Sequence, residues 1–129
     1  GSYFASPFVY TSAILCTPKP GDYVVDMQDS YGDGWQGDGI KVTFDGGPRD
    51  GEVVFIDMLS SGSGGPACCS WTESTETLNV PEGTVGFTWE YQGDVFPGEV
   101  SFQIYAPDGS LLGSYAAIGA GSLTILNCF

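Results

Sequence analysis

The sequence contains no histidine and only three lysine or arginine residues among its 129. Without histidine it lacks the commonest general base, so most acid–base and nucleophilic enzyme mechanisms become improbable. Sixteen Asp and Glu residues bring the net charge to −13, and so acidic a chain cannot neutralise the phosphates of nucleic acid or of an anionic membrane. No apolar run approaches the ~20 residues of a membrane span. We therefore expect no enzyme, no nucleic-acid partner and no membrane insertion.

The chain is nevertheless rich enough in apolar residues to fold. Hydrophobic residues make up 42%, with 3 Trp, 7 Tyr and 8 Phe, whereas disordered acidic chains are poor in aromatics. The 20 Gly and 8 Pro residues divide the sequence into short β-rich runs. The expected strands are Tyr3–Leu15, Gly21–Met27, Gly39–Phe44, Glu52–Leu59, Glu73–Val80, Thr84–Tyr91, Val100–Tyr105, Ser110–Ala117 and Ser122–Asn127.

Alternation supports this strand pattern. In the run from Ile40 to Phe44, the apolar residues Ile40, Val42 and Phe44 share one face. The segment Pro107–Ser110 has the composition of a turn between two strands, with Gly109 able to adopt a positive φ. No stretch shows helical periodicity. The sequence therefore predicts an all-β domain, a two-sheet jelly-roll or CUB-like sandwich of about eight or nine strands.

The four cysteines do not have zinc-site spacing. They are Cys16, Cys68, Cys69 and Cys128, and an adjacent pair cannot easily occupy two corners of a zinc tetrahedron. Two disulfides are the better interpretation, which predicts a secreted, extracellular protein. Neighbouring side chains on a strand point to opposite faces. We therefore expect 16–68 with 69–128 or 16–69 with 68–128, and a vicinal 68–69 bond is the third alternative.

The N-terminal segment carries no charged side chain before Lys19. An extended Tyr3–Leu15 would be apolar on both faces, with Phe4, Phe8, Tyr10 and Ile14 on one of them. Such a strand needs cover on both sides. It either fills the core of its own domain or completes the sheet of a neighbouring copy, and repeated donation would build an open filament. We divide the chain into this candidate donor strand with its Pro elbow (1–20) and a β-sandwich domain (21–129).

The densest cluster of acids lies between the first two strands of that domain. Its carboxylates are Asp26, Asp29, Asp33 and Asp38, interleaved with glycines. Asp29 and Asp33 occupy positions 1 and 5 of a pattern that has Gly at position 6, as a calcium loop begins. Position 12 is Ile40 and not Glu, so further ligands must come from elsewhere. Asp94 and Glu99 are the best remote candidates for a Ca²⁺ site, and Trp35 is expected to pack under the loop.

Two motifs resemble a known extracellular module. The run Asp29–Gly37, followed by Ile40 and Val42, looks like the D-S-Y-G-D-G-W-N-G module of large secreted and cell-surface proteins of bacteria and algae, except that Gln36 replaces the usual Asn. The segment 96–105 resembles the second signature of that module. The resemblance spans roughly residues 22–112 and implies a CUB-like, calcium-binding sandwich with a structural or adhesive role. It makes Asp29, Asp33 and Glu99 the preferred ligands.

These observations favour an extracellular structural or adhesive module, a subunit of a filament or surface assembly stabilised by calcium and disulfides. The alternative is a calcium-dependent carbohydrate- or peptide-binding module, with Trp71, Trp89 or Tyr91 as a stacking platform. Trp89 shares a strand face with Phe87 and Tyr91, however, which suits a sandwich interior. An enzyme is the weakest hypothesis: Glu90 or Glu99 with an aspartate could form a glycosidase pair, but acids are abundant here by composition alone.

Overall fold

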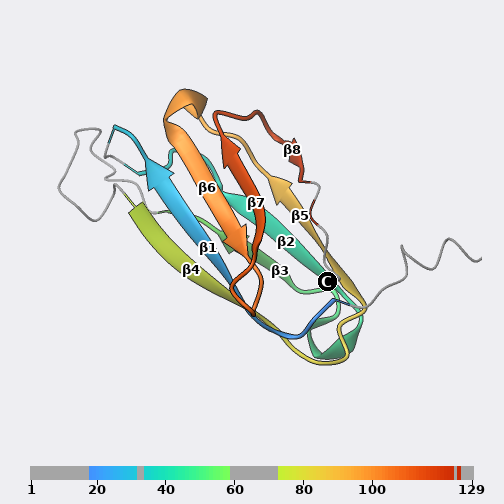
Figure 1. Ribbon diagram of the computed structural model, residues 1–129. Coiled ribbons are helices and arrows are strands. Elements are labelled where there is room, and N and C mark those ends of the chain that lie inside the picture. The colour runs from blue at the N-terminus through green and yellow to red at the C-terminus, as the bar shows by residue number, and fades with distance from the viewer. Residues whose placement is uncertain (1–17, 32–33, 59–72, 124, 126–129) are drawn as a thin grey trace, which may run out of the picture.

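The computed structural model describes residues 18–31, 34–58, 73–123 and 125. These residues form eight strands and no α-helix (Figure 1). The strands are β1 (Gly21–Asp29), β2 (Ile40–Asp45), β3 (Val53–Ile56), β4 (Glu73–Val80), β5 (Gly86–Tyr91), β6 (Val100–Tyr105), β7 (Leu111–Ala116) and β8 (Gly121–Ser122). Two short 3₁₀ turns, η2 (Gly47–Arg49) and η4 (Pro97–Glu99), connect them. A membrane-crossing helix, which would need to be long and apolar, is not found among the described residues.

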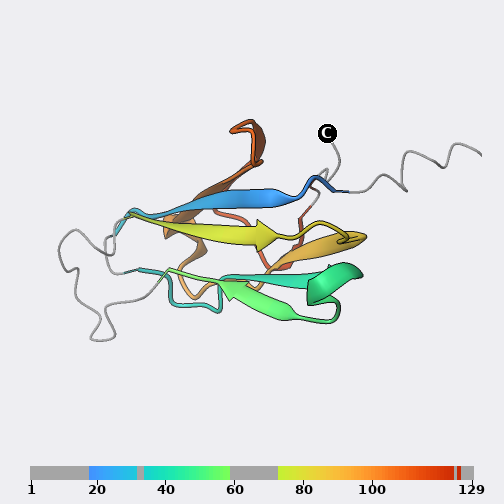
Figure 2. The ribbon, with the colours of Figure 1, turned by 90° about the horizontal axis from the view of Figure 1, so that it is seen from below.

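The strands form two four-stranded sheets, in the orders β4-β1-β6-β7 and β3-β2-β5-β8. Every pairing is antiparallel. Figure 2 shows the two layers, with β1 and β4 in one and β2 and β3 in the other. The predicted all-β, two-sheet sandwich is thus confirmed.

The core lies between the sheets and follows directly from the alternation in the sequence. On β1, Tyr23, Val25 and Met27 are fully buried, while their neighbours in sequence are not. Burying each such side chain contributes about 1.5–3 kcal/mol. The opposite sheet supplies the buried residues Ile40, Val42, Phe44, Ile56, Phe87, Trp89 and Tyr91. Edge-to-face contacts across the core include Tyr23 with Phe87, whose ring centroids are 5.3 Å apart.

Most strand limits agree with the sequence-based prediction. The bounds of β4 and β6 coincide with those expected, whereas β3 is shorter than Glu52–Leu59. β5 begins at Gly86 because Thr84 belongs to a turn, in which its hydroxyl donates a hydrogen bond of 2.8 Å to the carbonyl of Pro81. The predicted strand Tyr3–Leu15 lies outside the described residues.

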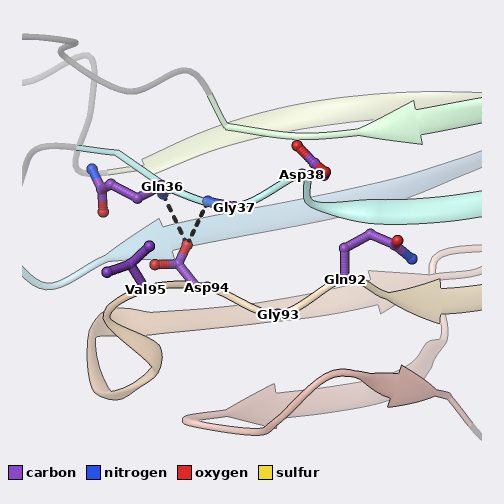
Figure 3. A pocket seen from close by; sticks show the side chains of 7 residues that line it. All are labelled: Gln36, Gly37, Asp38, Gln92, Gly93, Asp94 and Val95. Carbon is purple, nitrogen blue, oxygen red and sulfur yellow. Dashed lines mark hydrogen bonds between the residues drawn. The ribbon is translucent and has the colours of Figure 1, made fainter.

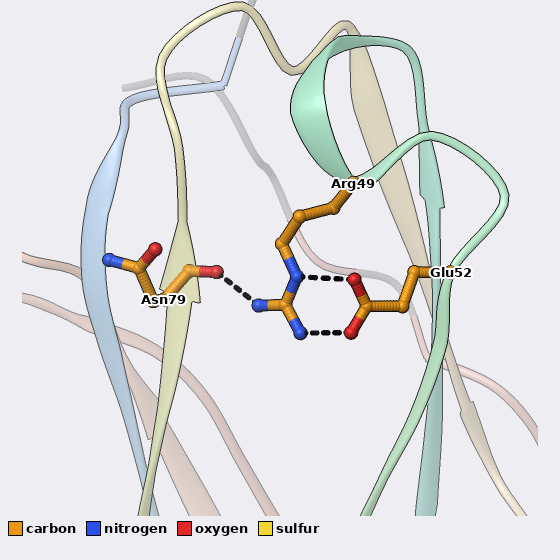
Figure 4. A network of polar contacts seen from close by, with 3 residues as sticks. All are labelled: Arg49, Glu52 and Asn79. Atoms are coloured by element: carbon orange, nitrogen blue, oxygen red, sulfur yellow. Dashed lines mark hydrogen bonds and ion pairs between the residues drawn. The ribbon is translucent and has the colours of Figure 1, made fainter.

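A polar contact joins the two sheets at the end remote from the acidic loop, the segment between β1 and β2 (Figure 4). Arg49 in η2 donates to the carboxylate of Glu52, with an Nε–Oε1 distance of 2.9 Å, and to the carbonyl of Asn79 on β4 at 2.7 Å. Its guanidinium also lies 4.4 Å from the ring centroid of Phe44. Arg49 therefore connects the β2–β3 turn of one sheet to the edge strand of the other.

Candidate functional site

The acidic loop begins where β1 ends, at Asp29. This side chain is only 1% exposed, and its Oδ2 accepts a hydrogen bond of 3.0 Å from the backbone N–H of Gly34. Trp35, 2% exposed, donates its indole N–H to the carbonyl of Gln28 and packs against Tyr91 and Phe102. Trp35 thus anchors the loop to the core, and the prediction that it packs there is confirmed.

Glu99 lies beside this loop although it is far away in the sequence. Asp29 pairs with Val100 in the β1–β6 register, and the N–H of Ser30 donates to the carbonyl of Glu99 at 3.0 Å. We call this place, formed by Asp29 and Glu99, the corner. The third preferred ligand, Asp33, lies outside the described residues. Within the ranges that the structure describes, no three acidic, histidine or cysteine side chains gather closely enough to hold a metal ion, so calcium binding stays a prediction.

Asp26 lies away from the corner. Residues of β1 alternate between the core and the outer face, and Asp26 is on the outer face while Asp29 points inward. The Oδ1 of Asp26 accepts a hydrogen bond of 2.8 Å from the hydroxyl of Thr75 on β4. The sheet therefore separates these two predicted ligands.

Asp94 organises the contact between two loops (Figure 3). Its Oδ2 accepts the backbone N–H groups of Gln36 at 2.9 Å and Gly37 at 3.1 Å, and its Oδ1 accepts that of Phe96 at 2.8 Å. The loops approach so closely that a Cβ on Gly37 would overlap the carbonyl oxygen of Gly93. In this structure Asp94 holds the segment after β5 against the segment before β2.

A pocket of about 310 Å³ opens at this junction. Asp38, the remaining predicted ligand, is exposed at the pocket. The lining residues are Gln36, Gly37, Asp38, Gln92, Gly93, Asp94 and Val95 (Figure 3). The structure thus divides the predicted ligands among the corner, the pocket and the outer face of β1.

Asp57 is the residue that the sequence analysis missed. It directly follows β3, and burial is the main cause that raises its pKa to about 6. A hydrogen bond from the Met58 backbone opposes this rise, and the negative charges of Asp38 and Asp94 add to it. Burial, together with the negative charges of Asp94 and Asp57, raises the pKa of Tyr91 to about 12. The available signal was a single carboxylate within the otherwise apolar run from Val53 to Met58.

Two of the three aromatic residues considered for a stacking platform are core residues. Trp89 is 3% exposed and Tyr91 1% exposed, so neither can stack on a ligand at the surface. Trp71 lies outside the described residues, as do all four cysteines and the proposed donor-strand residues Phe4, Phe8, Tyr10 and Ile14. The aromatic-platform hypothesis was therefore wrong for Trp89 and Tyr91.

Comparisons with known proteins add no further constraint. No protein-family model, curated protein or solved structure matched the chain.

Proposed function

We propose that this protein is an extracellular structural or adhesive module, a subunit that polymerises when residues 3–15 of one copy add a strand to the sheet of the next. Ca²⁺ and disulfides would stabilise each subunit. The observation that carries this proposal is the edge formed by β3.

β3 is an edge strand without the usual protection against pairing. It pairs with β2 on one side and with no second strand among the described residues. It consists only of Val53, Val54, Phe55 and Ile56, and the side chains of Val53 and Phe55 are 44% and 53% exposed. Natural edge strands are commonly guarded by charge or proline. The edge strand β4 carries Glu73 and Glu76, so β3 is a better acceptor than β4.

Charge favours an apolar segment as the occupant of this edge. Two copies of a chain with net charge −13 repel one another. Residues 1–18 contain no charged side chain, so a contact between this segment and β3 brings no like charges together. Strand addition supplies backbone hydrogen bonds, and the alternate apolar side chains of the donor supply specificity.

The corner supports the calcium part of the proposal. Asp29 and Glu99 come from distant parts of the chain, and their backbones meet where β1 ends. A Ca²⁺ ion held by Asp29, Asp33 and Glu99 would lock this meeting point, because carboxylate oxygens are the ligands that Ca²⁺ prefers. Asp26, Asp38 and Asp94 lie elsewhere, and we therefore leave them out of the proposed ligand set.

Assembly can be tested by sedimentation velocity and electron microscopy of three proteins: the full chain, a chain without residues 1–15, and the variant Phe55→Lys. We expect filaments from the full chain and monomers from the other two, because the deletion removes the donor and the lysine places a charge on the acceptor. Thr75→Lys, on the exposed face of β4, is the matched control and should still assemble. A full chain that stays monomeric at every concentration contradicts strand donation.

Calcium binding has its own test. Removal of Ca²⁺ with EDTA should lower the melting temperature, since a ligand that binds only the folded state stabilises it. The variants Asp29→Asn and Glu99→Gln should lose this response, and Asp26→Asn should keep it. An identical melting curve with and without EDTA for the wild-type chain would remove calcium from the proposal.

A further inference from the structure

Five aspartates in this chain are followed directly by glycine. These steps are Asp33–Gly34, Asp38–Gly39, Asp45–Gly46, Asp50–Gly51 and Asp108–Gly109. At such a step the backbone nitrogen of the glycine can attack the side-chain carboxyl carbon of the aspartate, because glycine has no Cβ that hinders the approach. The product is a cyclic imide, a covalent change of the chain that needs no enzyme or cofactor. The fold then decides which of these steps can react.

The glycine nitrogen is held by a hydrogen bond at the other four steps, with distances between 2.7 and 3.0 Å. The pairs are Gly34 N–H to Asp29 Oδ2, Gly46 N–H to Asp50 Oδ1, Gly51 N–H to the Phe44 carbonyl and Gly109 N–H to the Ala106 carbonyl. The Oδ1 of Asp108 also accepts the N–H and the hydroxyl of Ser110, at 2.9 and 2.6 Å. These bonds must break before the nitrogen can turn toward the neighbouring carboxyl.

The step Asp38–Gly39 differs from the other four. The N–H of Gly39 makes no hydrogen bond to any residue that the structure describes, and the exposed carboxylate of Asp38 accepts none from that part of the chain. The carbonyl of Gly39, in contrast, accepts the N–H of Gln92 at 2.8 Å. Gly39 is therefore held through the atom that does not react, while both reacting groups of the step can approach one another.

The burial of Gly39 favours ring closure further. Gly39 is buried, and a buried backbone N–H without a partner raises the free energy of the folded chain. In the imide this nitrogen carries no hydrogen, so ring closure removes a donor that the described residues leave unused. Asp38 beside it is exposed, so water can reach the ring and open it.

We propose that Asp38–Gly39 is a site of spontaneous isoaspartate formation in the folded protein. The nitrogen of Gly39 bonds to Cγ of Asp38, and the hydroxyl of the protonated carboxyl leaves with the amide proton as water. Water then adds to the imide at one of its two carbonyl carbons. Attack at Cγ restores aspartate, whereas attack at the main-chain carbonyl carbon of Asp38 breaks the bond from that carbon to nitrogen and leaves isoaspartate. The reaction needs neither strand donation nor calcium, so it is independent of the function proposed above.

Isoaspartate at position 38 would disturb the start of β2. It adds a methylene group to the main chain and converts the former main-chain carbonyl of Asp38 into a free carboxylate. The neighbouring space is closed, since a Cβ on Gly39 would overlap the carbonyl oxygen of Ile56 and lie 2.9 Å from Cα of Asp57. The lengthened chain therefore displaces Gly39 and weakens its hydrogen bond from Gln92.

The test is incubation of the folded protein for several weeks at physiological temperature in a mildly acidic buffer, because the hydroxyl of a protonated carboxyl is the leaving group. Proteolysis and electron-transfer mass spectrometry then locate isoaspartate. In the folded protein we expect it to form at Asp38 about tenfold faster than at the other steps, the factor that corresponds to one backbone hydrogen bond. In guanidinium chloride, where the fold holds no nitrogen, we expect similar rates at all the steps.

Two variants separate the site from the rest of the chain. Asp38→Glu keeps the exposed charge but must close a larger ring, so we expect it to remove most of the isoaspartate formed in the folded protein. Asp45→Glu changes another exposed aspartate that precedes glycine, and it should leave the amount at Asp38 unchanged. In aged wild-type protein the amide of Gln92 should exchange its hydrogen faster than in fresh protein, and in aged Asp38→Glu it should not.

The proposal is wrong if the folded protein forms no isoaspartate at Asp38, or forms it at all the steps as evenly as the protein in guanidinium chloride. Isoaspartate that stays at the wild-type amount in Asp38→Glu would also contradict it, because the modification would then lie elsewhere. Unchanged hydrogen exchange at Gln92 in aged protein would refute the displacement of Gly39.

Discussion

The two acidic places in this molecule, the corner and the pocket, differ in what their carboxylates face. At the corner, the buried Asp29 accepts a backbone N–H of Gly34. Near the pocket, Asp57 accepts a hydrogen bond from the Met58 backbone, but burial and the like charges of Asp38 and Asp94 raise its pKa, and one of its oxygens is enclosed without a partner among the described residues. Buried carboxylates stabilise a fold when they meet backbone donors, and they cost stability when they meet one another.

The largest expected effect is at the corner. Asp29→Ala removes an acceptor from a buried site and leaves the N–H of Gly34 without it, which should lower the free energy of unfolding by about 2–3 kcal/mol. Urea denaturation in the presence of EDTA measures this loss apart from any bound calcium. Asp26→Ala, on the outer face of the same strand, should change it by no more than about 0.5 kcal/mol. Equal losses in the two variants would break the distinction between the faces of β1.

The ionised carboxylate of Asp57, near the pocket, should instead lower the free energy of unfolding. The pKa of Asp57 is raised from 3.8 to about 6 in the folded protein, so the folded state binds more protons than the unfolded state between these values. Stability from this group is present below about pH 4 and is lost as the pH rises to about 6. Asp57 is partly exposed, so solvent screening limits the loss to about 1 kcal/mol.

Asp57→Asn makes this linkage measurable. The variant and the wild type should have similar unfolding free energies near pH 4, and the variant should be the more stable by about 1 kcal/mol above pH 6. Urea denaturation across this pH range measures the difference. A difference that does not vary with pH would show that Asp57 has an ordinary pKa.

The smallest effect is expected from Asp38→Asn, which removes an exposed charge near Asp57. The pKa of Asp57 should fall, because one like charge is lost, but it should stay above 3.8, because burial is the larger cause of the shift. Carbon-13 NMR of the Asp57 carboxyl group across the titration measures this directly. A return to the ordinary value would mean that charge, and not burial, dominates the pocket.

The sequence predicted the sheets better than it predicted the site, and the reason is physical. Alternation such as Ile40, Val42 and Phe44 is a local property, so strands and their buried faces can be inferred without knowing the pairing. The pocket depends on the register that sets Ile40 opposite Ile56 and Tyr91. That register joins positions 38, 57 and 94, and no spacing in the sequence indicates it.

The corner shows both what the sequence could predict about the site and what it could not. The neighbourhood of Asp29 and Glu99 was anticipated from the resemblance of two motifs, and the two backbones meet in the structure. Asp26 and Asp94 were grouped with them because they are acidic and near in sequence to the same motifs. The strand alternation that turns Asp26 outward and the three backbone N–H groups that bind Asp94 separate them.

The close approach of Gly37 to Gly93 has a consequence for how this surface can change. Because no side chain fits at position 37, a larger residue there would push the segment after β5 away and carry Asp94 with it. The part of the pocket lined by Gly37 and Gly93 is therefore fixed in shape by two backbones. Gln36, Asp38 and Gln92 also line the pocket, and substitutions there would change its lining without entering this close approach.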